Sequence, residues 1–140
     1  MAFNVLVVDD SAVMRQMVVR TLRMSGVPLG QVLEAGNGEE GLHVLQEQWV
    51  DLLLLDINMP VMNGVQFLET VRAEDRYTGI PVIIVSTAGR EADTRKGLSL
   101  GAKGYITKPF SPNTLHTMIE TIVHLPVPVA APAGAARSGR

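Results

Sequence analysis

Short apolar runs alternate with longer amphipathic segments along most of this 140-residue chain. Three of the runs, at residues 5–8, 52–55 and 82–85, contain no polar residue and are too short to form helices. Uniformly apolar runs of this length are typical of strands that are buried on both faces of a parallel sheet. Two weaker runs, at residues 31–35 and 104–107, complete a set of five expected strands.

The segments between these runs carry apolar residues at helical spacing. Ser11 is placed to cap the first helix, Asn37 to open the second, and Pro112 lies at the start of the last. A weaker helix is expected over residues 90–100, and Trp49 is expected to pack near the end of the second helix. The side chains expected to face inward are Met14, Met17, Val18, Leu22, Leu42, Leu45, Phe67, Leu68, Val71, Leu115, Met118, Ile119, Ile122 and Val123. Five strands alternating with five helices predict an α/β fold with a doubly wound parallel sheet.

The composition predicts one domain over residues 1–125 and a disordered Pro/Ala-rich tail over residues 126–140. The net charge is −2, and the body of the chain is more acidic because two arginines lie at its very end. This balance argues against nucleic-acid binding. The absence of cysteine excludes thiolate sites and disulfide scaffolds. With no apolar run long enough for a membrane span and no signal-peptide pattern, a cytoplasmic protein is expected.

Polar side chains follow four of the five expected strands. Asp9 and Asp10 come directly after the first strand, Asp56 after the third, Ser86 after the fourth and Lys108 after the fifth. Ligands of open α/β sheets bind outside the carboxyl ends of the strands. The sequence therefore predicts one site that holds three carboxylates, a hydroxyl and an ammonium group.

Three clustered carboxylates repel one another, so a cation is expected beside them. Carboxylate oxygens at an open edge suit Mg²⁺. Three carboxylates, Mg²⁺ and Lys108 together have no net charge, and such a site can receive a dianionic phosphoryl group. An aspartate can attack phosphorus to form an aspartyl phosphate, while the cations stabilise the equatorial oxygens.

Four segments carry a resemblance to a known family: residues 7–11 (VVDDS), 56–60 (DINMP) with Gly64, 81–86 (PVIIVS) and 104–110 (GYITKPF). In this order and spacing the chain resembles a response-regulator receiver domain over residues 3–125. The layout is most similar to the single-domain chemotaxis type. The resemblance implies a flavodoxin-like sheet of five strands in the order 2-1-3-4-5.

The resemblance also implies a role for each acidic residue. Asp56 is the implied phosphoacceptor. Asp9, Asp10 and Asp56 are the implied Mg²⁺ ligands, with Asp10 binding directly and Asp9 partly through water, and Asn58 adding its backbone carbonyl. Lys108 is implied to pair with Asp56 and later with a phosphoryl oxygen. The donor is implied to be a histidine kinase or a histidine phosphotransfer protein.

A switch is implied by the same resemblance. Ser86 is implied to move toward the phosphoryl group while Tyr105 turns inward, which changes the face of the fourth helix, fifth strand and fifth helix for a protein target. Thr87 stands where the family usually has a small residue and could narrow access to the site, and Ala88 lies at a position that influences hydrolysis. A monomer is expected, and dimerisation on phosphorylation is left open.

Three other functions compete with this interpretation. Residues 36–41 form the pattern G-x-G-x-x-G of a nucleotide-binding enzyme, but Glu39 and Glu40 would repel a pyrophosphate there. A Mg²⁺-dependent phosphohydrolase would use Asp56 as nucleophile, but Asn58 cannot transfer the proton that turnover of an external substrate needs. A scaffold protein that carries out no phosphotransfer would not need all three of Asp9, Asp10 and Asp56. We therefore expect catalysis only of the chain's own phosphorylation and dephosphorylation.

Overall fold

Five parallel strands form one sheet in the order β2-β1-β3-β4-β5, which confirms the predicted α/β fold and strand order. The computed structural model describes residues 2–57, 64–87 and 89–123. The predicted tail at 126–140 lies outside these residues. In chain order the elements are β1 (Phe3–Val8), α1 (Ala12–Met24), β2 (Leu29–Ala35), α2 (Gly38–Glu47), β3 (Leu52–Asp56), α3 (Gly64–Arg72), the 3-10 helix η1 (Asp75–Tyr77), β4 (Val82–Ser86), α4 (Glu91–Ser99), β5 (Gly104–Thr107) and α5 (Pro112–Val123).

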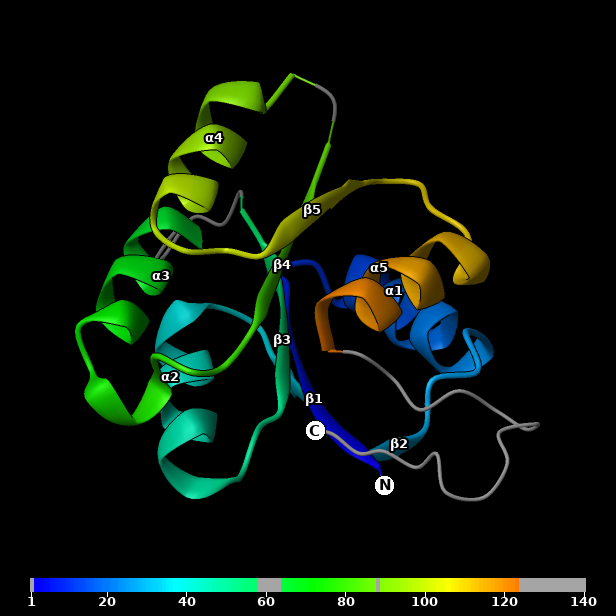
Figure 1. The fold of residues 1–140 in the computed structure, drawn as a ribbon, viewed down its shortest axis with the longest axis horizontal. Coiled ribbons are helices and arrows are strands. Elements are labelled where there is room, and N and C mark those ends of the chain that lie inside the picture. Colours follow the sequence, from blue (N-terminus) through cyan, green and yellow to red (C-terminus); the bar gives the residue numbers. More distant parts are fainter. Residues whose placement is uncertain (1, 58–63, 88, 124–140) are drawn as a thin grey trace.

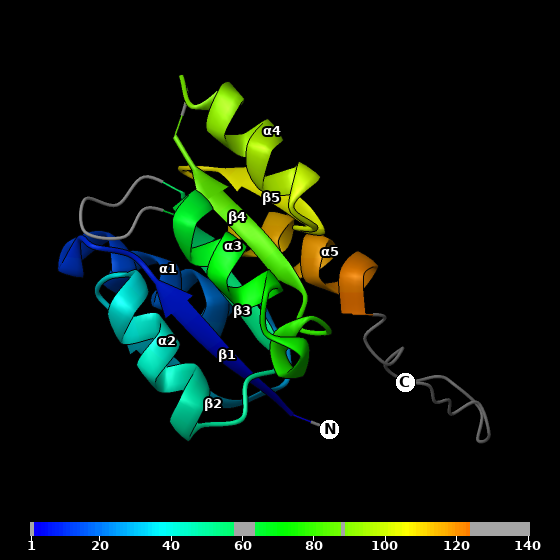
Figure 2. The same ribbon diagram turned by 90° about the vertical axis from the view of Figure 1, so that its left-hand side faces the viewer.

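Helices cover both faces of the sheet (Figure 1). The pair α1 and α5 lies on one face, and α2, α3 and α4 lie on the other. Strands β3 and β4 are buried along their whole length, as their uniformly apolar sequences predict. In both views the strands run in the same direction, so their carboxyl ends share one edge of the molecule (Figure 2).

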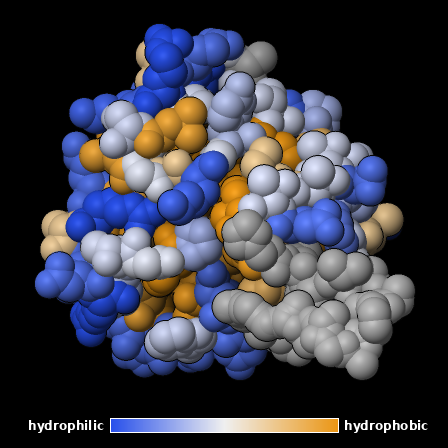
Figure 3. Space-filling model, viewed as in Figure 1, coloured by the Kyte–Doolittle hydropathy of each residue, from blue (hydrophilic) through white to orange (hydrophobic). Residues whose placement is uncertain are grey.

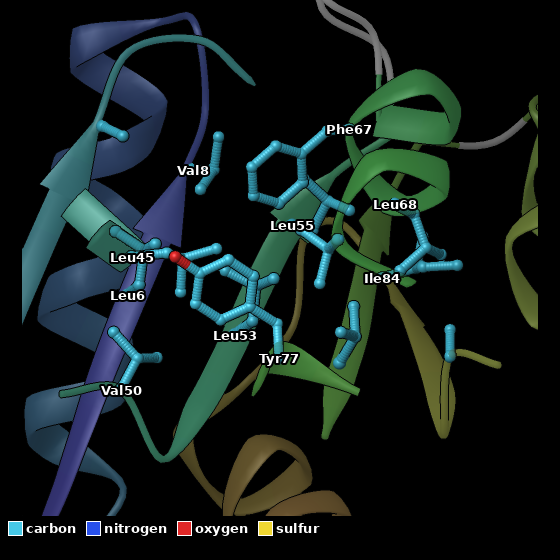
Figure 4. Close-up of a cluster of buried hydrophobic side chains, with 14 of the residues drawn as sticks. Leu6, Val8, Leu45, Val50, Leu53, Leu55, Phe67, Leu68, Tyr77 and Ile84 are labelled. Atoms are coloured by element: carbon cyan, nitrogen blue, oxygen red, sulfur yellow. The ribbon is translucent and has the colours of Figure 1, made fainter. Parts of the chain in front are cut away.

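Apolar side chains fill the space between the sheet and the layer of α2 and α3 (Figure 4). Phe67 and Leu68 of α3 are fully buried against β3 and β4, which confirms the inward face predicted for that helix. The Tyr77 ring lies among Leu6, Leu45 and other members of this cluster, and its hydroxyl has no hydrogen-bond partner among the described residues.

Two side chains expected to be inside are exposed. Met17 is 53% exposed and Trp49 is 76% exposed. Met17 lies beside the buried stripe of α1. The helical spacing of apolar residues shows which face of α1 is buried, but it does not show how wide that face is. Trp49 follows Gln48, which caps α2 in an extended conformation, so Trp49 is in a loop and not on the helix.

Arg72, at the end of α3, links two connecting segments that the sequence did not predict to meet. Its guanidinium donates to the carbonyls of Thr78 and Ile80 at 3.0 and 3.3 Å, and to those of Leu100 and Gly101 at 3.2 Å. Burial lowers the pKa of Arg72 from its usual value. These bonds fix η1 and the α4–β5 turn against α3.

None of the helices in the described part of the chain is long and apolar enough to cross a membrane.

Candidate functional site

The residues predicted to share a site do meet at the carboxyl edge of the sheet. Asp9 follows β1 directly, Asp56 is the last residue of β3, Ser86 is the last residue of β4, and Lys108 follows β5. The register supports this placement, because Asp56 is paired with Val85, next to Ser86 in β4. Four separate segments therefore deliver polar side chains to one place.

The three carboxylates converge. Asp9, Asp10 and Asp56 each offer an oxygen, and these oxygens lie within 4.8 Å of one another. Asp9 and Asp56 are only 2% and 7% exposed, whereas Asp10 is open to solvent. Hard oxygen donors brought together at an edge that water reaches fit Mg²⁺, which retains several water ligands.

Lys108 reaches into this cluster from β5. Its Nζ atom lies 3.1 Å from Oδ2 of Asp9, and the two side chains are 10% and 3% exposed. A buried carboxylate needs such a partner because desolvation penalises an isolated charge. Pairing of Lys108 with Asp56 stays a prediction.

Arg15 holds the backbone beneath Asp9, a role that the sequence analysis missed. Its Nη1 donates to the carbonyl of Asp9 at 2.7 Å, and its Nε pairs with Glu34 of β2 at 2.9 Å. Ser11 N also donates to Asp9 Oδ1 at 3.0 Å. The β1–β2 register, which brings Glu34 opposite Val7, is needed to see this arrangement, and local spacing does not reveal it.

Gly64 fits tightly beneath the end of β3. Its backbone N–H donates to the carbonyl of Ile57 at 3.2 Å. A Cβ atom at this position would lie 2.6 Å from the Cα of Ile57 and 2.8 Å from the carbonyl oxygen of Asp56. The glycine of the matching motif therefore permits a close backbone approach beside Asp56. Asn58 lies outside the described residues.

The ends of β4 and β5 form the other side of the site. Ser86 is 4% exposed, and its carbonyl accepts from the backbone N of Lys108 at 2.7 Å. Thr87 is exposed directly beyond Ser86, and Tyr105 is 49% exposed on β5. Ser86, Thr87 and Tyr105 line a hollow of about 280 Å³ between α4 and β5. Ala88 lies outside the described residues.

Residues 5–120 match the family model described as the response regulator receiver domain. The chain belongs to this family. It is 40% identical over 121 residues to a chemotaxis protein CheY homolog of Campylobacter jejuni, covering 86% of this chain and 92% of that protein. The structure of the Vibrio cholerae chemotaxis protein CheY4 is similar, with a TM-score of 0.74 and 35% identity over 89% of this chain and 99% of that one.

A second group of relatives is longer than this chain. The phosphate regulon transcriptional regulatory protein PhoB of Escherichia coli is 38% identical over 130 residues, which are 93% of this chain but only 56% of PhoB. The chain thus spans about half the length of these relatives. What the comparisons establish is the receiver domain of a two-component response regulator.

Proposed function

We propose that this receiver domain accepts a phosphoryl group on Asp56 with Mg²⁺ bound, and passes the signal to a protein partner. The observation that carries the proposal is the convergence of three carboxylate oxygens within 4.8 Å at the edge where Lys108 also arrives. Structural ion pairs alone do not need three carboxylates around one ammonium group, since the surplus negative charge destabilises the fold.

The proposed reaction is a transfer from phosphohistidine to Asp56. A carboxylate oxygen of Asp56 attacks phosphorus and forms an O–P bond, while the P–N bond to the imidazole breaks and its electron pair stays on nitrogen. Asp56 lies at the end of a buried strand, so its backbone is fixed before the donor arrives. The ammonium of Lys108 balances negative charge on the phosphoryl oxygens.

Asp9, Asp10 and Asp56, with the backbone carbonyl of Asn58, would hold Mg²⁺. When bound, the ion neutralises negative charge on the phosphoryl oxygens. Asp9 is oriented from two sides, by the backbone of Ser11 and by Lys108. Asp10 is open to solvent, where a hydrated ion can reach it.

The signal would leave through Ser86 and Tyr105. Ser86, at the end of β4, would hydrogen-bond the phosphoryl group, and Tyr105, which lines the hollow between α4 and β5 together with Ser86, would turn inward. Phosphorylation would then shift an existing equilibrium toward an altered α4-β5-α5 face. Three further points stay predictions. They are a target in chemotaxis or in a phosphorelay, a monomeric state that could change on phosphorylation, and a cytoplasmic location.

Intact-mass measurement with phosphoramidate, with and without Mg²⁺, tests the proposal. We expect a gain of one phosphoryl group only with Mg²⁺, and no gain for Asp56→Asn. An equal gain in Asp56→Asn would overturn the assignment. A parallel assay with an external phosphomonoester separates this function from a phosphohydrolase, because more than one equivalent of released phosphate would require turnover.

Thr87 offers a test of access to the site. Its branched side chain is exposed directly after Ser86 and also borders a second hollow beside Lys108 and Phe110. Removing about 0.5–1 kcal/mol of steric hindrance corresponds to about a two- to fivefold faster reaction. We therefore expect Thr87→Ala to speed labelling by phosphoramidate by this factor. Unchanged or slower labelling would show that Thr87 does not restrict entry.

A further inference from the structure

A groove of about 530 Å³ lies at the opposite end of the sheet from the acidic site. The end of α2, the loop before β3 and the η1–β4 connection line it, including Glu47, Trp49, Tyr77 and Pro81. Figure 3 shows apolar surface in this region, between α2 and the strands, with polar surface around it. None of the phosphotransfer residues contributes to this groove, so its function is separate from the proposed one.

The exposed Trp49 is held in a fixed orientation. Its indole Nε1 donates to Oδ1 of Asp51 at 2.8 Å, and Oδ2 of Asp51 accepts from the backbone N of Asn4 at 2.9 Å. On the other side of the groove, the guanidinium of Arg76 lies 4.8 Å from the centre of the Tyr77 ring. An aromatic side chain that is both exposed and oriented in advance is typical of a binding hot spot.

Trp49 is the exposed aromatic side chain of this groove, since Tyr77 is only 6% exposed. Exposed aromatic side chains in grooves recognise proline-containing segments in the extended polyproline conformation, which lose little entropy on binding. This chain carries such a segment, since residues 125–132 read LPVPVAAP. Arg137 and Arg140 follow it, and residues 124–140 contain no acidic side chain. Glu47 and Asp51 at the groove supply the opposite charge and outnumber Arg76, the basic residue in its lining.

The C-terminal segment also leaves α5 at the correct end of the sheet. A Cβ atom at Gly104, the first residue of β5, would lie 3.5 Å from Cδ1 of Ile122, so the last turn of α5 lies where the strands begin. Figures 1 and 2 both place the end of α5 and the η1–β4 connection at this end. Pro132 lies nine residues beyond Val123. Nine residues in polyproline conformation span about 28 Å, whereas five strands are about 19 Å across.

We propose that residues 125–132 of this chain run along the end of the sheet and dock intramolecularly in the Trp49–Tyr77 groove around Pro132, with the two terminal arginines near its acidic side chains. Docking would cover Trp49, the single tryptophan of the chain. Acrylamide can reach Trp49 only in the fraction of molecules whose C-terminal segment is undocked. Acrylamide quenching of tryptophan fluorescence in the full chain therefore reports docking directly.

The test compares the wild type with Pro126→Ala/Pro128→Ala/Pro132→Ala. We expect the Stern–Volmer constant to rise about twofold or more in the proline variant, as the open fraction grows. Ser138→Ala, in the same segment, should leave it unchanged. Equal constants for the wild type and the proline variant would overturn the proposal.

A charge reversal tests the same contact from the groove. Glu47→Lys, at an exposed position, should raise the quenching constant, and Arg137→Glu/Arg140→Glu in the same chain should reverse the effect. Glu69→Lys, at an exposed position of α3, serves as the control. The constant should not depend on protein concentration. Protection that grows with concentration would mean docking on a second copy and would contradict an intramolecular site.

Discussion

Lys108 is the one ammonium group that the described residues bring into contact with the acidic cluster. Lys108→Ala would leave Asp9 buried without this partner. We expect the free energy of unfolding in Mg²⁺-free buffer to fall by about 3–5 kcal/mol, as measured by urea denaturation. The exposed Lys103→Ala should change it by less than about 0.5 kcal/mol. Equal stability of Lys108→Ala and the wild type would show that this ion pair contributes nothing to the fold.

Asp56→Asn should have the opposite effect on stability. The amide keeps the shape of the side chain but removes one of three negative charges whose oxygens lie within 4.8 Å. Relief of this repulsion should raise the free energy of unfolding in Mg²⁺-free buffer by about 1–3 kcal/mol. A loss of stability on denaturation would indicate that the Asp56 charge stabilises the fold.

At the scale of elements, Gly64 allows α3 to begin close against the end of β3. Gly64→Ala would bring a methyl group against the backbone of Asp56 and Ile57, so we expect a loss of about 1–3 kcal/mol in the free energy of unfolding. Gly79→Ala is the matched control, because no atom lies within 4 Å of its added Cβ. If both variants unfold at the same urea concentration, the close approach at Gly64 has no energetic consequence.

The elements themselves were largely predictable from local sequence. Buried parallel strands are apolar throughout, and Ser11 accepts from Met14 N as the predicted helix cap. The second strand begins at Leu29, earlier than predicted, because its half-exposed residues show no clear period. The helix η1 was not predicted. Arg72 joins the segment after η1 to the distant α4–β5 turn, and no local pattern indicates its bonds to Leu100 and Gly101.

The site was predictable because topology brings strand ends together. Asp9, Asp56, Ser86 and Lys108 could be grouped from their positions after strands alone. Arg15 could not be added to this group from the sequence, because only the register of β1 with β2 brings its partners Asp9 and Glu34 together. Trp49 was wrongly predicted to pack, because the point where α2 ends decides its exposure. A long-range contact thus accounts for the missed role of Arg15, and the unpredicted end of α2 accounts for Trp49.

For the whole molecule, Mg²⁺ binding should be coupled to folding, because the three carboxylates converge only in the folded chain. At ten times its dissociation constant, Mg²⁺ should raise the free energy of unfolding by about 1.4 kcal/mol. Thermal denaturation with MgCl₂, compared with NaCl of equal ionic strength, measures this change. Asp10→Asn should reduce it. The same stabilisation by NaCl would argue for screening of the cluster and against a specific ion site.

The central claim is that Asp56, and neither of its acidic neighbours, receives the phosphoryl group. Reduction of the phosphorylated chain with borohydride converts an aspartyl phosphate to homoserine, and peptide mass spectrometry then locates the modified position. We expect homoserine at position 56 only, and only in samples treated with both phosphoramidate and Mg²⁺. Homoserine at position 9 or 10, or none at all in a sample that has gained a phosphoryl group, would contradict the assignment.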